Sequence, residues 1–137
     1  MSERTRYAAI VEQDGRVLCV RPANAAGDAW EFPSASIEGD ETPEQALSRM
    51  LEGELGVRPR SLWYYDSFTT ATDGGDLNVD CYVCPLDDAS EVTQGDTLES
   101  RWLSQAELLD PQWTPSDREV ATSLGVFWGQ AFAPSHL

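Results

Sequence analysis

The sequence predicts an α/β fold in a single domain. Three observations carry this prediction. First, the beginning and the middle of the chain contain runs of β-forming residues that are bounded by turn residues. Second, one capped amphipathic helix separates these two groups of runs. Third, a second helical pattern lies near the end of the chain. The order β-β-β-α-β-β-β-α-α fits a mixed sheet that packs against helices. At 137 residues, the chain is long enough to bury a hydrophobic core as one domain, 1–137.

Two strands are expected at Arg6–Glu12 and Arg16–Arg21, where apolar side chains dominate. The dipeptide Asp14–Gly15 lies between them and is a strong signal for a tight hairpin turn. A loop of small residues, Pro22–Asp28, leads to a short strand expected at Trp30–Phe32. The chain therefore begins with a hairpin and one further strand ahead of the first helix.

The first helix is expected from Pro43 to Leu55. Thr42 suits the N-cap and forms a capping box with Gln45, and proline is favoured at the first helical position because an N–H would have no partner there. Gly56 suits the left-handed residue past the helix end. Local chemistry thus defines both ends of this helix.

Glu54 is expected in the apolar face of this helix. Because the helix turns by about 100° per residue, Glu54 falls between Met50 and Leu47. An unpaired buried carboxylate is very costly, and the helix dipole disfavours an anion near the C-terminus. Glu54 must therefore bind a cation, pair with an arginine or reach solvent at the edge of the face.

The second half of the chain is predicted from β-propensity, turn residues and helical spacing. The expected elements are strands at Ser61–Thr70, Leu77–Leu86 and Glu99–Leu103, a turn at Ala71–Asp76, a short capped helix at Ser104–Leu109 and a closing helix at Ser116–Phe127. Pro85 lacks an N–H and marks the point where its strand leaves the sheet. The closing helix places Val120, Leu124 and Phe127 on one face, and residues 128–137 form a tail that packs on the core or on a partner chain.

Composition restricts the partners of this chain. The formal net charge is −15, and all nine basic residues are arginine. Such an acidic surface repels a phosphate backbone, so no nucleic-acid polymer is expected to bind, although a high-salt host would also favour this composition. No run is apolar and long enough to cross a membrane, and the N-terminus leads straight into a strand. We expect a cytoplasmic protein with no membrane partner.

Metal or redox chemistry at cysteine is not expected. Cys81 and Cys84 form a C-x-x-C pair, but an odd separation in a strand points the two side chains to opposite faces. There is no second such pair, and the only histidine is His136. Buried free thiols are the expected state of these two cysteines and of Cys19.

The stretch Trp30–Val57 reads W-E-F-P-S-A-S-I-E-G-D-E-T-P-E-Q-A-L-S-R-M-L-E-G-E-L-G-V. This stretch resembles the signature of the Nudix hydrolases, G-x5-E-x7-R-E-U-x-E-E-x-G-U, in which U is apolar. The spacing holds without a gap, with Glu41, Arg49 and Glu54 at the Glu, the Arg and the last Glu of the signature. The resemblance covers about residues 6–127 and implies a Nudix-like α/β/α sandwich around a central mixed β-sheet.

Four positions depart from the signature. Ser34 and Ala35 replace the paired glycines of the family's usual lead-in, W-x-x-P-G-G-x-I-E-x-G-E, the second of which begins the signature. Met50 replaces the Glu after the Arg, and Gly53 replaces the first Glu of the E-E pair. In the family, these two glutamates and the last one hold divalent metal ions, so one ligand of the three remains. A thioether offers nothing to Mg²⁺, which prefers oxygen ligands. The frame of the signature is kept while much of its chemistry is lost.

The resemblance implies a metal-dependent hydrolase of a nucleoside diphosphate linked to another group, with Mg²⁺ or Mn²⁺ as the cofactor. Glu54 is then the catalytic carboxylate and the principal metal ligand. Further candidate metal ligands are Glu38, Asp96 and Glu99. The resemblance makes Glu41 and Arg49 a structural brace between the loop and the helix, with two independent surface charges as the alternative. Arg21 faces a substrate phosphate in this frame, or is a solvated arginine at a strand end.

Two functions follow from the resemblance. The first is a hydrolase whose activity is reduced by the loss of two glutamates, with metal binding that is weak or absent at the signature. The second is a non-catalytic module that binds or responds to a nucleotide, since a fold does not fix a function. Either function takes a small nucleotide-type ligand, and the family also makes a homodimer an expectation. No base-specific or sugar-specific motif indicates the substrate itself.

Overall fold

The computed structural model describes residues 4–23, 29–87, 89–93, 95 and 98–133. Among these residues, six strands form one mixed sheet. The strands are β1 (Arg4–Gln13), β2 (Arg16–Pro22), β3 (Ser34–Ala35), β4 (Trp63–Thr72), β5 (Gly75–Pro85) and β6 (Leu98–Leu103). Their order in the sheet is β4-β5-β1-β2-β6, and β3 pairs with β1 off this path. β1 and β5 run parallel, while the other pairs are antiparallel.

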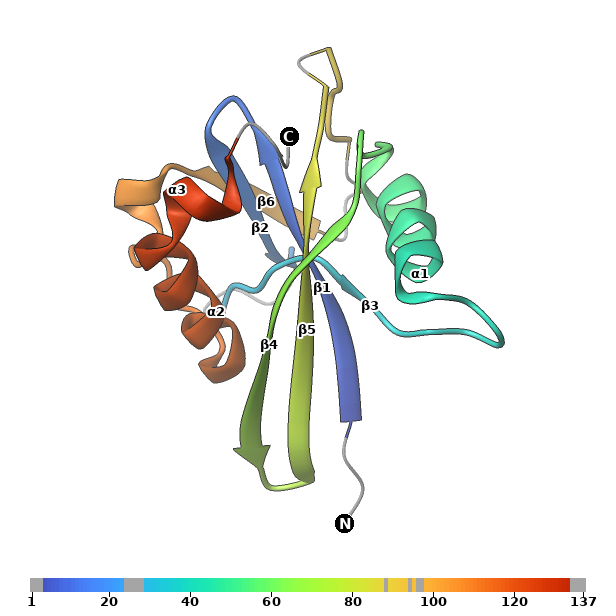
Figure 1. Ribbon diagram of the computed structural model, residues 1–137, viewed down its shortest axis with the longest axis vertical. Coiled ribbons are helices and arrows are strands. Elements are labelled where there is room, and N and C mark those ends of the chain that lie inside the picture. Colours follow the sequence, from blue (N-terminus) through green and yellow to red (C-terminus); the bar gives the residue numbers. More distant parts are fainter. Residues whose placement is uncertain (1–3, 24–28, 88, 94, 96–97, 134–137) are drawn as a thin grey trace.

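Helices cover both faces of the sheet (Figure 1). On one face, α1 (Pro43–Met50) runs directly into a π-helical segment, η1 (Leu51–Leu55). On the other face lie α2 (Pro115–Val126) and α3 (Trp128–Ala131), which follow a 3-10 turn, η2 (Gln105–Glu107). This arrangement confirms the predicted sandwich of a mixed sheet between helices. Among the described helices, none combines the length and apolarity that crossing a membrane requires.

The predicted ends of the first helix are confirmed. The N–H of Gln45 donates to Thr42 Oγ1 at 3.1 Å, and the N–H of Thr42 donates to Gln45 Oε1 at 2.9 Å. Gly56 takes the left-handed conformation, with φ at 67°. The helical segment therefore runs from Pro43 to Leu55 as expected, although its last turn is wider than an α-helical turn.

That wider turn corrects the expected position of Glu54. A π-helix turns by less per residue than an α-helix, so side chains beyond Met50 no longer follow the α-helical spacing. Leu51 and Leu55 remain buried, whereas Gly53 and Glu54 are exposed. The prediction that Glu54 lies inside the apolar face is therefore wrong, and its carboxylate reaches solvent at the edge of the helix.

An apolar core lies on each face of the sheet. The core beneath α1 and η1 contains the large side chains Leu18, Leu47, Leu51 and Leu55. The core beneath α2 contains Ile10, Phe32, Leu103 and Leu124. Cys81 and Cys84 are buried free thiols in opposite cores, as their odd separation predicts, and Cys19 is buried and free as well. Burial raises the pKa of all three thiols, which keeps them protonated and unreactive.

The strand predicted at Trp30–Phe32 is displaced in the structure. Trp30 and Glu31 form only isolated bridges, and the strand that precedes the helix is β3, beyond Pro33. Pro33 has no N–H to donate, while its carbonyl accepts the N–H of Ala9 at 2.8 Å. Regular pairing with β1 therefore begins only after the proline.

The C-terminal residues also differ from the prediction. Residues 128–131 form α3 where a tail is expected, and Trp128 and Phe132 pack on the core beneath α2. Phe127 is expected on the buried face of the closing helix, but it is 48% exposed. Its backbone angles, φ −104° and ψ 22°, end α2 just before α3 begins, so its ring no longer follows the buried face of α2.

A buried carboxylate joins α2 to the sheet. Asp117 lies in the first turn of α2 and is fully buried. Its Oδ2 accepts the N–H of Phe32 at 2.8 Å, and its Oδ1 accepts a hydrogen bond from the guanidinium of Arg6. Arg6 also donates to Glu31 at 3.1 Å. Burial raises the pKa of Asp117, while Arg6 acts in the opposite direction. These contacts connect β1, the segment before β3 and α2.

Replacement of this carboxylate should destabilise the domain. In Asp117→Ala, the guanidinium of Arg6 and the N–H of Phe32 lose their partner. Breaking a buried pair in this way costs about 3–5 kcal/mol, and we expect the free energy of unfolding, measured by urea denaturation, to fall by about that amount. Glu119→Ala, at an exposed position of the same helix, is the control and should change it by less than about 0.5 kcal/mol. Equal effects of the two variants would contradict the anchoring role of Asp117.

Candidate functional site

The loop before α1 is held to the helix by one arginine. Arg49 donates from Nε to Glu41 Oε2 at 2.9 Å and from Nη2 to Glu41 Oε1 at 3.1 Å. Its Nη2 also donates to the carbonyl of Ser36 at 2.9 Å, and its Nη1 lies 3.4 Å from Glu38 Oε2. The hydrogen bond from Arg49 lowers the pKa of Glu41, and the same contact raises the pKa of Arg49. Glu41 and Arg49 are therefore in direct contact and are not independent surface charges.

A cleft of about 370 Å³ lies between this loop and the helix. The residues that line it are Ser34 and Ala35 from β3, Ser36 and Glu38 from the loop, and Arg49, Met50, Gly53 and Glu54 from α1 and η1. The charge of Glu54 also contributes to the raised pKa of Arg49. The structure thus brings two of the candidate metal ligands, Glu38 and Glu54, to one cleft, together with the two helix positions that depart from the signature.

The oxygen donors of this cleft do not fit the metal site that the signature implies. Met50 presents a thioether at a glutamate position, and Gly53 presents no side chain. Glu38 is 72% exposed and lies beside Arg49, and Glu54 is exposed. Across the described residues, no group of three or more Asp, Glu, His or Cys side chains could hold a metal ion. No catalytic step through a bound metal follows from this set of donors.

Two other candidate residues contact each other. Arg21 on β2 stands opposite Glu99 on β6 in the sheet register, and its Nη2 lies 3.2 Å from Glu99 Oε2. The guanidinium of Arg21 also covers the ring of Trp30, 4.6 Å from the centroid. Neither Arg21 nor Glu99 is among the described residues that line the cleft beside Glu54. Asp96, the remaining candidate ligand, lies outside the described residues.

A second pocket, of about 470 Å³, lies at the N-terminal end of α2. Three buried polar atoms of its lining have no hydrogen-bond partner among the described residues: Arg6 Nε, Thr70 Oγ1 and Thr114 Oγ1. Thr114 is the N-cap residue of α2, where a threonine hydroxyl ordinarily accepts a backbone N–H, but here it makes no such bond. Unsatisfied buried polar groups are costly, so these atoms indicate a place for a polar ligand or for water.

Sequence reasoning missed this second pocket. Its residues come from three strands (β1, β4 and β5), from the segment before β3, from the turn after β4 and from the start of α2. The contact between Arg6 and Asp117 beside it joins positions 111 residues apart. Glu31, which lines the pocket, falls within the strand expected at Trp30–Phe32 and belongs to no motif in the sequence. The one sequence feature that could have indicated the pocket is the run Thr114–Asp117. It contains three side chains that can cap a helix, whereas the start of one helix needs a single N-cap.

Known proteins share the sequence pattern of this chain. The model of the NUDIX domain matches residues 1–124. CTP pyrophosphohydrolase of Escherichia coli (strain K12) is 32% identical over 113 residues, which cover 80% of this chain and 82% of that protein. RNA pyrophosphohydrolase of Halorhodospira halophila is 46% identical over 50 residues, which cover 36% of this chain and 26% of that protein. The matched region thus spans about a quarter of the length of the second relative.

Solved structures share the fold. The E. coli ORF135 protein gives a TM-score of 0.79 at 27% sequence identity, over 97% of this chain and 96% of that one. The NUDIX domain of Shewanella oneidensis NrtR, solved in complex with ADP ribose, gives 0.65 at 18% identity, over 89% of this chain and 86% of that one. At so low an identity, the second likeness shows the fold alone.

Loss of Arg49 should loosen the loop without unfolding the domain. In Arg49→Gln, the oxygens of Glu41 and Ser36 lose their shared donor, and we expect the backbone amides of residues 36–40 to exchange with solvent several-fold faster in hydrogen–deuterium exchange. Arg58→Gln removes an exposed pair with Glu52 and serves as the control, with no change at these amides. Unchanged exchange in Arg49→Gln would show that the arginine does not hold the loop.

Proposed function

The chain belongs to the Nudix family, and on this premise we propose that it binds a nucleotide-type diphosphate and hydrolyses it weakly or not at all. The observation that carries the proposal is the cleft beside α1. This cleft keeps the arginine-held loop of the signature, while Met50 and Gly53 stand at two of its three metal-holding glutamate positions. The relatives named pyrophosphohydrolase support a diphosphate as the ligand.

The cleft is better suited to binding than to hydrolysis. Attack on the phosphorus of a diphosphate is commonly assisted by metal ions that neutralise its charge and activate water. Of the three signature glutamates that hold metal ions in the family only Glu54 remains, and Glu38 in the same cleft lies beside Arg49. Arg49 binds phosphate oxygens when a diphosphate displaces one of its carboxylate partners, and two serines, Ser34 and Ser36, line the same cleft. These groups can hold a diphosphate without cleaving it.

The second pocket is a separate place for the polar groups of a ligand. Arg6 Nε and the hydroxyls of Thr70 and Thr114 offer hydrogen bonds to the heteroatoms of a base or a ribose. This pocket lies on the face of the sheet that α2 covers, whereas the cleft lies on the face that α1 covers. Binding at the second pocket is therefore tested apart from binding in the cleft.

Hydrolysis with a reduced metal site is the second candidate function. Glu38 and Glu41 contact the guanidinium of Arg49 and Glu54 acts on it electrostatically, so the charges here sum to a negative value that attracts a divalent cation without forming a set of three converging donors. Mg²⁺ often keeps several waters and needs only one or two protein carboxylates when the substrate supplies phosphate oxygens. The alignment with CTP pyrophosphohydrolase, which covers most of both chains, favours this second candidate.

Reinstated glutamates should distinguish the two candidates. Gly53 has open space where a side chain would begin, so a glutamate fits there without a clash. We expect Met50→Glu/Gly53→Glu to release phosphate from nucleoside diphosphate derivatives, with Mg²⁺ or Mn²⁺, more than an order of magnitude faster than the unmodified chain. Addition of Glu54→Gln to this variant should abolish the gain.

Two further measurements keep this test decisive. Met50 is buried and a buried charge is costly, so the free energy of unfolding of the double variant is measured by urea denaturation. Gly53→Glu alone replaces an exposed helical glycine and should not lower that free energy, so it separates the effect of the two substitutions. If the unmodified chain turns over a substrate as fast as the double variant does, and Glu54→Gln alone abolishes that turnover, the chain is a hydrolase with a reduced site and the proposal fails.

Binding at the second pocket should depend on Thr114. Thr114→Val removes a hydroxyl that caps no helix, so stability changes little while a bound nucleotide loses a hydrogen bond. We expect the affinity for nucleoside diphosphates, measured by isothermal titration calorimetry, to fall about three- to tenfold. Thr122→Val, at an exposed position of the same helix, is the control and should have no effect. Equal affinities of the two variants would exclude the second pocket from the nucleotide site.

A further inference from the structure

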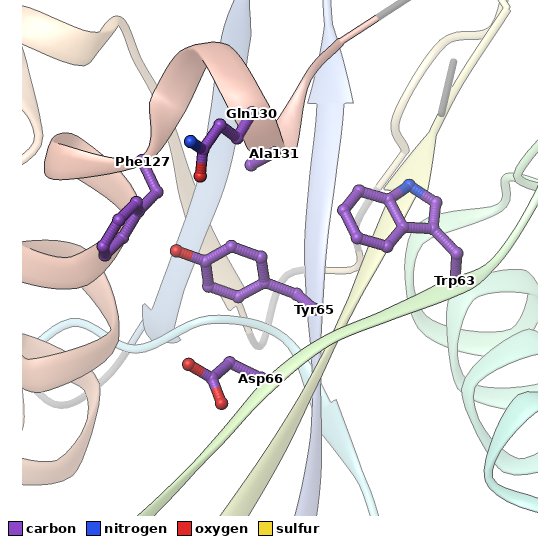
Figure 2. Close-up of a pocket in the computed structure, with 6 residues that line it drawn as sticks. All are labelled: Trp63, Tyr65, Asp66, Phe127, Gln130 and Ala131. Atoms are coloured by element: carbon purple, nitrogen blue, oxygen red, sulfur yellow. The ribbon is translucent and has the colours of Figure 1, made fainter. Parts of the chain in front are cut away.

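A third pocket, of about 350 Å³, lies where the start of β4 meets the C-terminal end of α2 and α3 (Figure 2). Trp63 and Tyr65 project from β4 toward the helices, because side chains two residues apart in a strand share a face. Phe127, Gln130 and Ala131 line the pocket from the helical side. α2 has 12 residues, so about 18 Å of helix separates this pocket from the second pocket at its other end.

An irregularity in β4 directs a carboxylate into the same pocket. In a regular strand, Asp66 would face away from its neighbour Tyr65. The pairing register between β4 and β5 shifts between Tyr64 and Asp66, and Asp66 lines the pocket together with Tyr65. β-Bulges re-aim side chains in this way and are frequent next to functional sites. The irregular pairing of β4 therefore lies at the residue, Asp66, whose carboxylate is placed beside the aromatic rings.

The aromatic side chains border the pocket without closing it. Trp63 and Tyr65 meet edge to face, with ring centroids 6.4 Å apart and ring planes at 73°. The hydroxyl of Tyr65 lies 3.0 Å from Ser123 Oγ, which fixes the ring against α2. Phe127 is 48% exposed. The pocket therefore offers aromatic surface that is held in place and is accessible to a ligand.

The charge of the pocket is negative. Among the described residues that line it, Asp66 carries the only charge, and Gln130 adds an amide. Asp66 Oδ1 accepts the N–H of Ser67 at 2.8 Å, and no arginine within the described residues forms an ion pair with it. The net charge of −15 on the whole chain acts in the same direction. An anionic ligand is therefore repelled from this pocket, and a cation is attracted.

We propose that this pocket binds a small organic cation that carries an alkylated ammonium group. Such a cation is attracted both to the faces of the aromatic rings and to the carboxylate of Asp66. Its alkyl groups gain from contact with the apolar lining of Trp63, Phe127 and Ala131, which a hydrated metal ion would not. The proposal uses none of the residues of the nucleotide-type site and does not depend on that function.

Choline and its neutral carbon isostere test this proposal on the unmodified chain. The isostere replaces the trimethylammonium group by a tert-butyl group and so keeps the shape without the charge. We expect choline chloride, at an ionic strength held constant with NaCl, to give saturable binding in calorimetry and a saturable change in tryptophan fluorescence. The isostere should bind about tenfold more weakly, as expected when cation–π and carboxylate attraction are both lost.

Two variants locate the binding. Asp66→Asn removes the charge and Phe127→Leu removes an exposed ring, and each should weaken choline binding about threefold or more while the melting temperature stays unchanged. Asp110→Asn removes an exposed carboxylate outside the pocket and should leave choline binding unchanged.

Three results would overturn the proposal. Equal affinity for choline and the isostere would mean that the pocket has no preference for a cation. Absence of saturable choline binding would mean that the pocket is not a site for it. Unchanged choline affinity in both Asp66→Asn and Phe127→Leu would place the binding elsewhere on the acidic surface. Phosphate release is not measured in these experiments, so failure of the nucleotide function leaves their outcome unaffected.

Discussion

The arrangement of this domain depends on a charge kept inside it. A lone buried carboxylate is very costly, so Asp117 is tolerated because Arg6 and the N–H of Phe32 contact it. These contacts fix the segment that leads into the loop before α1, where Phe32 also stacks on Trp113 with ring centroids 4.6 Å apart. The same contacts hold the guanidinium of Arg6 at the second pocket, with its Nε left for a ligand or water. One junction therefore borders the second pocket and also fixes the segment that leads toward the cleft on the other face of the sheet.

This chain keeps the loop–helix contacts of the family signature but has lost two of its metal-binding side chains, and there is a physical reason why one can be kept without the other. Arg49 binds side-chain and backbone oxygens of the loop at the same time, and contacts of this kind do not need the neighbouring glutamates. Metal binding is different, because several oxygen donors must converge on one point and each lost donor leaves the ion less well held. A chain can therefore keep the shape of a hydrolase cleft after its metal donors are gone. Membership of the family therefore does not fix the reaction.

Features that short-range chemistry decides are the ones that the sequence predicts best. The capping box at Thr42 and the positive φ angles of Asp14–Gly15 depend on residues a few positions apart, and the structure has both. The fold class follows from the order of such elements together with the family resemblance. The exposed position of Glu54 does not follow, because the α-helical spacing that places it in the core fails in the wider last turn. The contact of Arg6 with Asp117 depends on sheet order and helix placement, which no local pattern contains.

Acidity acts in opposite ways on the ligands proposed here. Arg6 already pairs with Glu31 and Arg49 already pairs with Glu41, so a diphosphate must bring its own cation or displace an internal partner. The net charge of −15 opposes its approach at low salt, and added salt screens that repulsion. An organic cation meets the reverse situation at Asp66, where the same field favours its approach and salt weakens the attraction. Opposite salt dependences for the two ligands are therefore a consequence of a single charge distribution, and they require no communication between the two sites.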